Sequence, residues 1–291
     1  MALTEKQSRP RVTAVSHPER RARRAPSWSL GFALAIVAIV LFVTIFAQVV
    51  APQPLESVAM AQRLLPPSAR YVLGTDQLGR DMVSRLLYST QTSVLIAGSA
   101  TLLSGFIGAV LGALAGWFGK AVDTTVSFFI DVQSSIPGFI LALGALVFFG
   151  GTPAVLVIIL AIEGWERIAR VTRAEVMSIR RSGFVNSTLN LGVSRFTTIR
   201  NHVLPALIAP LTVQLTLAFP TKILLESALS FLGLGIRPPD TSLGQMVGTG
   251  QQYLAFAWWI VVVPSAAIFL ISLAVGIIGD YLQDRVIRNA G

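Results

Sequence analysis

Three charged side chains lie within or beside long apolar stretches of this 291-residue sequence: Asp131, Lys222 and Glu226. An ionised group in hydrocarbon is costly, so charges in such places usually serve a transport pathway, a proton relay or a structural ion pair. Lys222 and Glu226 are four residues apart, which puts both on one helix face within reach of each other. Two roles stay open, a pathway or gate and a structural pair facing the bundle, and we favour the pair. Asp131 is expected near the cytoplasmic membrane surface.

No set of residues has the spacing of an active site. The single glycine–lysine pair, Gly119-Lys120, lacks the Ser or Thr and the first glycine of a phosphate-binding loop. His17 and His202 are the only histidines, and neither a zinc HExxH pattern nor a Gly-x-Ser-x-Gly elbow occurs. The chain has no cysteine, which excludes disulfides and thiol chemistry. We predict a non-catalytic chain with no catalytic residue, no metal site and no cofactor of its own.

Composition indicates a membrane protein. Hydrophobic residues make up 53% of the chain and charged residues 13%, with a mean hydropathy of +0.69, which gives more apolar surface than one soluble core of this length needs. The net charge of +9 comes from basic blocks beside apolar stretches rather than from one basic face. We therefore predict no nucleic-acid partner.

Six apolar stretches approach the roughly 20 residues that a membrane-spanning helix needs. They are 30–51, 94–118, 125–149, the run that starts at Pro153, 206–232 and 257–278. We predict an all-α, polytopic membrane protein with six transmembrane helices.

The third and fourth stretches are the weaker ones. The third carries Asp131 and a polar run before Pro137, and the fourth reaches Glu163 after ten residues. Either stretch could be re-entrant. Omitting only the fourth would place seven arginines of the following segment outside, against the positive-inside rule. Treating both as a re-entrant pair passes the same test.

The distribution of Lys and Arg predicts the orientation. If all six stretches cross and the N-terminus is cytoplasmic, 17 of these residues lie inside and 5 outside, as the positive-inside rule expects. The regions are a disordered basic cytoplasmic tail at 1–29, a first transmembrane helix at 30–51, an extracellular segment at 52–91, and a five-helix core at 92–288 with a cytoplasmic loop at about 166–204.

Gly108, Gly112 and Gly116 repeat every four residues in the second stretch. A helix face without side chains allows close approach of another helix. Two readings weigh about equally: an interface with a second transmembrane subunit, and ordinary packing within this chain.

The most informative stretch is 184–210, which is polar, basic and set between apolar spans. We expect an amphipathic helix from about 166 to 181, a short helix, a break at Gly192, and a second helical stretch that ends before Pro205. This arrangement would form a small protrusion available for contact with another protein. An amphipathic helix lying on lipid headgroups is the alternative.

The stretch resembles the EAA loop of ABC importer permeases, in which Glu-Ala-Ala, a three-residue spacer and Gly precede a Pro-terminated stretch. Gly192 and the LGVSRFTTIRNHVLP frame at 191–205 fit it. GTDQLGRDMVSR at 74–85, ESALSFLGLGIRPP at 226–239 and the Gly279-Asp280 end are similar to motifs of C-type dipeptide and oligopeptide permeases.

The resemblance implies a type I importer permease fold in a bacterial inner membrane, with residues 92–288 as the permease core. Its implied partners are a second homologous permease, a cytoplasmic ABC ATPase with two domains that bind ATP and Mg, an extracellular solute-binding protein, and membrane lipid. The implied cargo is dipeptides or oligopeptides, with nickel chelates, glutathione or haem as alternatives.

The resemblance also assigns residues. ATPase coupling falls on Phe184, Asn186, Ser187, Thr188, Leu191 and Gly192. An extracellular gate or binding-protein contact is one reading of Gly74, Thr75, Asp76, Gly79, Arg80 and Asp81, with a folded cap as the alternative. One departure is plain: Asn186-Ser187-Thr188 replaces Glu-Ala-Ala, so the charged group expected to contact the ATPase is absent. The rival function is an ion-coupled secondary transporter that works alone.

Overall fold

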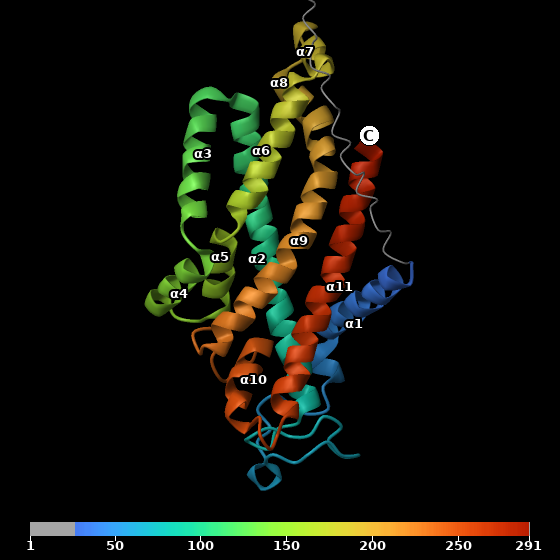
Figure 1. Cartoon of the computed structure of the whole chain (residues 1–291), viewed down its shortest axis with the longest axis vertical. Coiled ribbons are helices and arrows are strands. Elements are labelled where there is room, and N and C mark those ends of the chain that lie inside the picture. Colours follow the sequence, from blue (N-terminus) through green and yellow to red (C-terminus); the bar gives the residue numbers. More distant parts are fainter. Residues whose placement is uncertain (1–26, 291) are drawn as a thin grey trace, which may run out of the picture.

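The computed structural model describes residues 27–290, and every regular element in that range is a helix. The expectation of a disordered tail at 1–29 falls almost entirely outside the described residues. Four long apolar helices form the frame (Figure 1). They are α1 (Ser27–Val50), α2 (Met82–Phe118), α9 (Leu204–Phe231) and α11 (Trp259–Ala290). The all-α class is therefore confirmed.

The count of six spans is not confirmed. Four described helices are long and apolar enough to cross a bilayer, or up to five if one bent pair is a single span. That pair, α3 (Lys120–Ser135) and α4 (Gly138–Phe149), is bent by 85°. Pro137 at the break cannot donate a backbone hydrogen bond, which ends the first helix of the pair.

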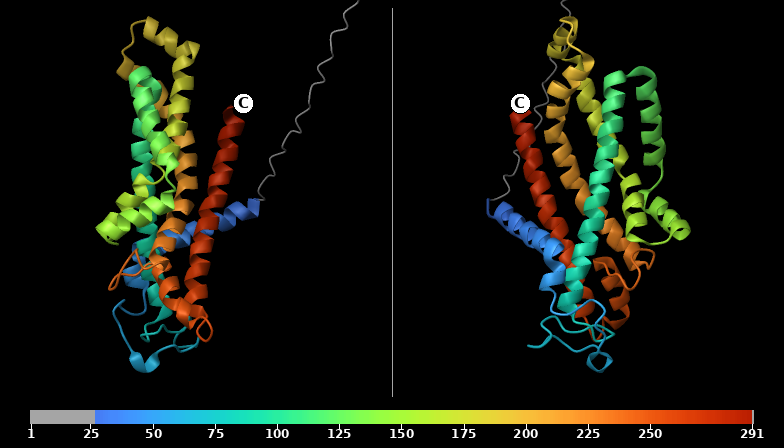
Figure 2. Two further views of the ribbon diagram at one scale, coloured as in Figure 1. Left: turned by 60° about the vertical axis from the view of Figure 1, so that its left-hand side comes forward. Right: turned by 180° about the vertical axis from the view of Figure 1, so that it is seen from behind.

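The fourth predicted span is also interrupted. Helix α5 (Pro153–Ile162) has 10 residues, about 15 Å of helix at 1.5 Å per residue. Gly164 then adopts a left-handed conformation with φ of 99°, and α6 (Trp165–Arg181) continues the chain. The third and fourth stretches thus form a hairpin of four shorter helices, α3 to α6, on one side of α2 (Figures 1 and 2).

The glycines of α2 pack against α6 of the same chain. A Cβ atom placed on Gly108 would lie 2.6 Å from the carbonyl oxygen of Trp165, and one on Gly116 would lie 2.8 Å from that of Arg173. A Cβ atom placed on Gly112 would lie equally close to the side chain of Thr172. We call this contact the α2–α6 seam. Packing within the chain therefore accounts for the glycine stripe, and the reading as an interface with a second subunit is wrong for this face.

The stretch after α6 follows the predicted order of helix, break and helix. It contains α7 (Gly183–Asn190), α8 (Arg195–Thr198) and a π-helical turn, η2 (Ile199–Val203), which leads directly into α9. The prediction that this second helix ends before Pro205 is wrong. Pro205 lies in the first turn of α9, where a missing backbone donor is tolerated.

The opposite end of the molecule holds the irregular segment 51–81, the short helix η1 (Met60–Gln62), α10 (Leu243–Gly250) and η3 (Gln251–Tyr253). Helices α7 and α8 project at the far end, on the side where α11 also finishes (Figures 1 and 2). The predicted segment 52–91 is partly helical, because α2 begins at Met82.

Candidate functional site

The projecting segment of residues 183–198, here called the coupling segment, turns at Gly192. Gly192 has φ of 83°, and no heavy atom lies within 4 Å of a Cβ placed on it. The hydroxyl of Ser194 accepts the backbone N–H of Thr197 at 3.2 Å and caps α8. Leu191 is 83% exposed and Phe196 is 73% exposed. The segment thus presents apolar side chains outward on a short, defined turn.

Of the six residues assigned to ATPase coupling, Ser187, Leu191 and Gly192 lie exposed on this segment. The side chains of the other three, Phe184, Asn186 and Thr188, are outside the described part of the structure. Their backbone belongs to α7. ATPase contact therefore stays a prediction for all six residues.

Val185 anchors the coupling segment to the helix bundle. It is buried in a cluster with Trp117 of α2, Val176 of α6, Val203 at the end of η2 and Leu207 near the start of α9. A displacement of α7 would consequently reach three long elements through apolar contact.

Helix α6 is also held by an ion pair to α3. Arg173 donates through Nη2 to Asp123 Oδ2 at 2.9 Å, and through Nε to Oδ1. The hydrogen bond to Asp123 raises the pKa of the Arg173 guanidinium above its usual value. Asp131, further along α3, is 78% exposed, with Arg170 Nη2 4.0 Å away. The expected position of Asp131 near the cytoplasmic membrane surface stays a prediction.

Lys222 and Glu226 both face the bundle, with 2% and 0% exposure, but the predicted ion pair between them is wrong. The Nζ atom of Lys222 lies 3.0 Å from Oε2 of Glu163 and also donates to the carbonyl oxygens of Leu160 and Glu163. Its partners therefore come from the end of α5, across the bundle.

Glu226 is bound by hydroxyl groups instead of a cation. Its carboxylate accepts Ser93 Oγ at 3.0 Å and Ser230 Oγ at 2.7 Å, with Ser227 Oγ at 3.4 Å. Ser93 also accepts the backbone N–H of Leu243 at 3.1 Å. This group, which we call the serine cage, joins α2, α9 and the start of α10.

A second polar group organises the segment 51–81 around Asp76, which is fully buried. Oδ2 of Asp76 accepts Arg80 Nε at 2.7 Å and Arg85 Nη1 at 2.8 Å. Oδ1 accepts the backbone N–H groups of Leu78 and Arg80, each at 2.8 Å. Arg85 also reaches Thr241 at 3.3 Å, so this group ties the segment 51–81 to the loop before α10.

The other predicted external residues serve the same scaffold. Asp81 accepts the N–H and hydroxyl of Ser84 at 2.8 Å and caps α2, while Trp259 donates to the carbonyl of Thr75 at 3.1 Å. Gly74 and Gly79 have positive φ and are buried. Of the six residues predicted to gate or to contact a binding protein, Arg80 alone is partly exposed, and that role stays a prediction.

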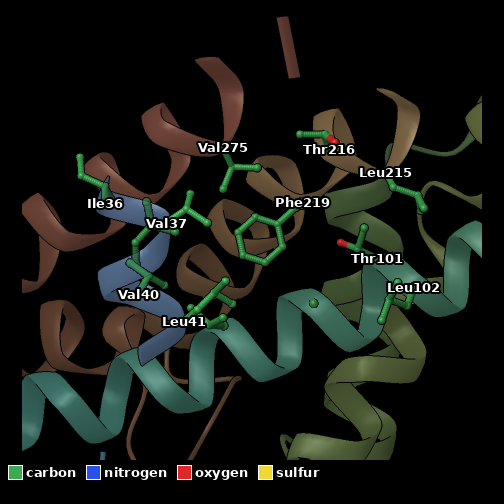
Figure 3. A pocket seen from close by; sticks show the side chains of 13 residues that line it. Ile36, Val37, Val40, Leu41, Thr101, Leu102, Leu215, Thr216, Phe219 and Val275 are labelled. Atoms are coloured by element: carbon green, nitrogen blue, oxygen red, sulfur yellow. The ribbon is translucent and has the colours of Figure 1, made fainter. Parts of the chain in front are cut away.

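One cleft in the helix bundle is apolar. It has a volume of about 360 Å³ and lies between α1, α2, α9 and α11, with Phe219 at its centre (Figure 3). Its two threonines, Thr101 and Thr216, donate their hydroxyl groups to carbonyls of their own helices. Both hydroxyl groups in the cleft wall are therefore already hydrogen-bonded within the chain.

A smaller polar cavity of about 110 Å³ adjoins the Lys222–Glu163 pair. Arg167, Gln214 and Thr221 contribute to its wall. No group of three or more metal-ligating side chains occurs among residues 27–290.

Sequence reasoning missed Glu163 and the serines as partners of the buried charges. A local signal existed for Glu163, because an acidic residue followed by Gly164 interrupts an apolar run. Ser93, by contrast, is one of several hydroxyl residues on α2. Which of these residues faces α9 depends on how the helices pack against each other.

Comparison with known proteins gives consistent matches. The family model described as "Binding-protein-dependent transport system inner membrane component" matches residues 108–288. A putative peptide transport system permease of Brucella suis biovar 1 is 34% identical over 265 residues, which cover 91% of this chain and 88% of the relative.

Two further relatives carry more specific names. The di/tripeptide transport system permease DppC of Pseudomonas aeruginosa is 35% identical over 88% of this chain and 88% of its own length. The dipeptide permease DppC of Bacillus subtilis is 32% identical over 94% of this chain and 86% of its own length. Among solved structures, the inward-facing MetNI methionine ABC transporter aligns with 69% of this chain and 97% of that chain, at 21% identity and a TM-score of 0.47.

Proposed function

This chain belongs to the binding-protein-dependent transport system inner membrane components, and we propose that it is the permease subunit of an ATP-driven importer for dipeptides or oligopeptides. Membership makes it a multi-pass membrane component of an ABC importer. The names of the relatives support peptides as cargo. What we propose beyond family membership is that transport depends on ATP and on a binding protein, and that the cargo is a dipeptide or oligopeptide.

The coupling segment is the single observation that carries the proposal. It projects beyond the bundle on α6, turns at a left-handed glycine and exposes Leu191 and Phe196. Its anchor, Val185, packs against α2, α6 and α9. Such a segment suits docking into a cleft of a separate ATPase, whose closure would then move three long helices together.

The proposed assembly contains this chain, a second homologous permease, two ATPase domains that bind ATP and Mg, and a solute-binding protein. The coupling segment and both termini face the cytoplasm, while the scaffold around Asp76 faces outward. The positive-inside distribution supports this orientation.

The environment of the buried charges disfavours an ion-coupled transporter that works alone. Such a protein needs charges that exchange partners along an ion path. Here Lys222 is occupied by Glu163 and two carbonyls, and Glu226 by serine hydroxyls. Glu226 is fully buried, and Lys222 borders the polar cavity with its ammonium group already hydrogen-bonded.

Reconstitution into proteoliposomes tests the proposal. We expect uptake of labelled dipeptides by the full complex only when ATP and the solute-binding protein are both present, because ATPase closure drives the cycle. Matched vesicles with a non-hydrolysable ATP analogue are the control. Uptake by this chain alone, driven by an ion gradient, would contradict the proposal and favour a secondary transporter.

A further inference from the structure

Two broken helices meet at Lys222. The chain bends between α3 and α4 and breaks again between α5 and α6 at Glu163 and Gly164. A Cβ atom on Gly138, the first residue of α4, would lie 2.8 Å from Oε1 of Glu163. The start of α4 therefore lies directly against the Glu163 side chain, and Lys222 of α9 reaches the same point.

Lys222 closes the end of α5. The last carbonyls of a helix lack backbone donors, and in an apolar bundle each unpaired group is costly. The ammonium group of Lys222 donates to the carbonyls of Leu160 and Glu163 and to the Glu163 carboxylate. A lysine has three donors, so all of them are used here. A cation at a helix C-terminus is also favourable electrostatically.

Gly164 makes this contact sterically feasible. Its φ of 99° requires little or no side chain, and a Cβ atom on it would lie 2.8 Å from Lys222 Nζ. Its N–H donates to Oε2 of Glu166 at 2.9 Å. Hydrogen bonds therefore hold the break from the α5 side and from the α6 side, and a third helix, α9, holds it as well.

The break separates two apolar cores. Helix α5 packs with α2, α4 and the outer part of α9 around Leu156, Leu160 and Leu229. Helix α6 packs at the other end with α2 and the coupling segment, around Val176 and Val185. The polar cavity of about 110 Å³ lies beside the break.

We propose that Lys222 is the positioning residue of a hinge between α5 and α6. It holds the break at Glu163 and Gly164 in one geometry, so that movement of the coupling segment on α6 reaches α4, α5 and the outer end of the bundle. The inference rests on the proposed function for its coupling to ATP, whereas the hinge itself is a property of this chain.

Spin labels across the break test the hinge directly. The chain contains no cysteine, so Ile158→Cys on α5 and Ser178→Cys on α6, both at exposed positions, can be labelled uniquely in the full chain in lipid nanodiscs. We expect one narrow distance distribution, and a broad or shifted one when Lys222→Met removes the donors. A wild-type distribution in Lys222→Met would overturn the proposal.

A second variant separates positioning from folding. Gly164→Ala keeps both charges but places a methyl group against Nζ, and we expect the same broadening. An unchanged distribution in this variant contradicts the hinge, even where Lys222→Met fails to fold.

A double variant separates capping from charge balance. Lys222→Met with Glu163→Met removes both charges but leaves the α5 carbonyls without a donor, so the broad distribution should persist. Recovery of the narrow distribution would show that Lys222 only balances the charge of Glu163. That result would overturn the positioning role.

Transport by the assembled complex gives the functional readout. We expect Lys222→Met to retain ATPase association, because the coupling segment is untouched, while uptake per ATP hydrolysed falls about tenfold, within the range typical of coupling between distant sites. Unchanged uptake per ATP would contradict the hinge. A wild-type complex without ATP-dependent uptake would instead contradict the proposed function, and the label distances would still decide the hinge.

Discussion

At the scale of single residues, Glu226 is a buried carboxylate whose bonded partners are neutral hydroxyl groups. Ser93, Ser227 and Ser230 surround it, and Ser93 also accepts from Leu243 at the start of α10. Leaving a buried polar group without a hydrogen-bond partner is costly. The serine cage therefore fixes where α10 sits against α2 and α9.

Replacing Glu226 tests the serine cage. We expect Glu226→Ala to lower the free energy of unfolding by about 2 kcal/mol, because several buried hydroxyl groups lose their acceptor. Denaturant unfolding in detergent micelles measures this change. Glu226→Gln keeps one acceptor oxygen and should cost less. Equal stability of Glu226→Ala and the wild-type chain would show that the cage contributes nothing.

The burial of both charges was predictable from the sequence, and their partners were not. Lys222 and Glu226 share one helix face, so a local pair was the natural expectation. Lys222 instead contacts Glu163, 59 positions away, and Glu226 contacts Ser93, 133 positions away. Side-chain spacing describes one helix, whereas these contacts depend on how several helices pack.

At the scale of elements, the α2–α6 seam holds the helix that bears the coupling segment. Three glycines of α2 lie against the backbone of α6. Without a hydrophobic driving force in lipid, such close backbone approach supplies much of the packing energy between helices.

Widening the seam should loosen α6. Gly112→Val places a branched side chain where a Cβ atom would already lie 2.8 Å from Thr172 Cβ, and we expect a loss of about 1–3 kcal/mol from overpacking. Thermal unfolding in lipid nanodiscs measures the change. The matched control is Gly276→Val on α11, where no atom lies within 4 Å. Equal melting temperatures for the two variants would argue against the seam.

The sequence predicted the four long helices, the amphipathic helix α6 and the break at Gly192, but it could not resolve residues 120–164. Apolar content alone reports whether a stretch suits a membrane, and it is insensitive to a Pro137 bend or a left-handed Gly164. The seam was also ambiguous, because a glycine stripe allows close approach without specifying which helix approaches.

At the scale of the whole molecule, α7 and α8 of the coupling segment lie at one end and the segment 51–81 at the other, with the break between α5 and α6 between them (Figure 1). Each end is fixed by a different kind of contact: apolar burial of Val185 at one end and buried charge pairs at the other. The hinge combines a buried ion pair with backbone capping.

Docking of the coupling segment can be tested at Gly192. We expect Gly192→Asp to weaken co-purification of the ATPase, because it adds a charge at the exposed turn, while the bundle stays folded since no neighbour is within 4 Å of the new Cβ. Gly192→Asn is the control: Asn and Asp both tolerate left-handed backbone, and Asn carries no charge. Equal ATPase recovery with both variants would exclude the charge as the cause.

The α2–α6 seam also bears on the order of events during synthesis. Gly112 leaves the ribosome well before Thr172, so the glycine stripe faces lipid until α3, α4 and α5 have been made. It then closes on a helix of the same polypeptide, without help from another subunit at that face. A nascent chain stalled before α6 would expose this stripe to any neighbouring helix, which makes that interval the time when mispairing is most favoured.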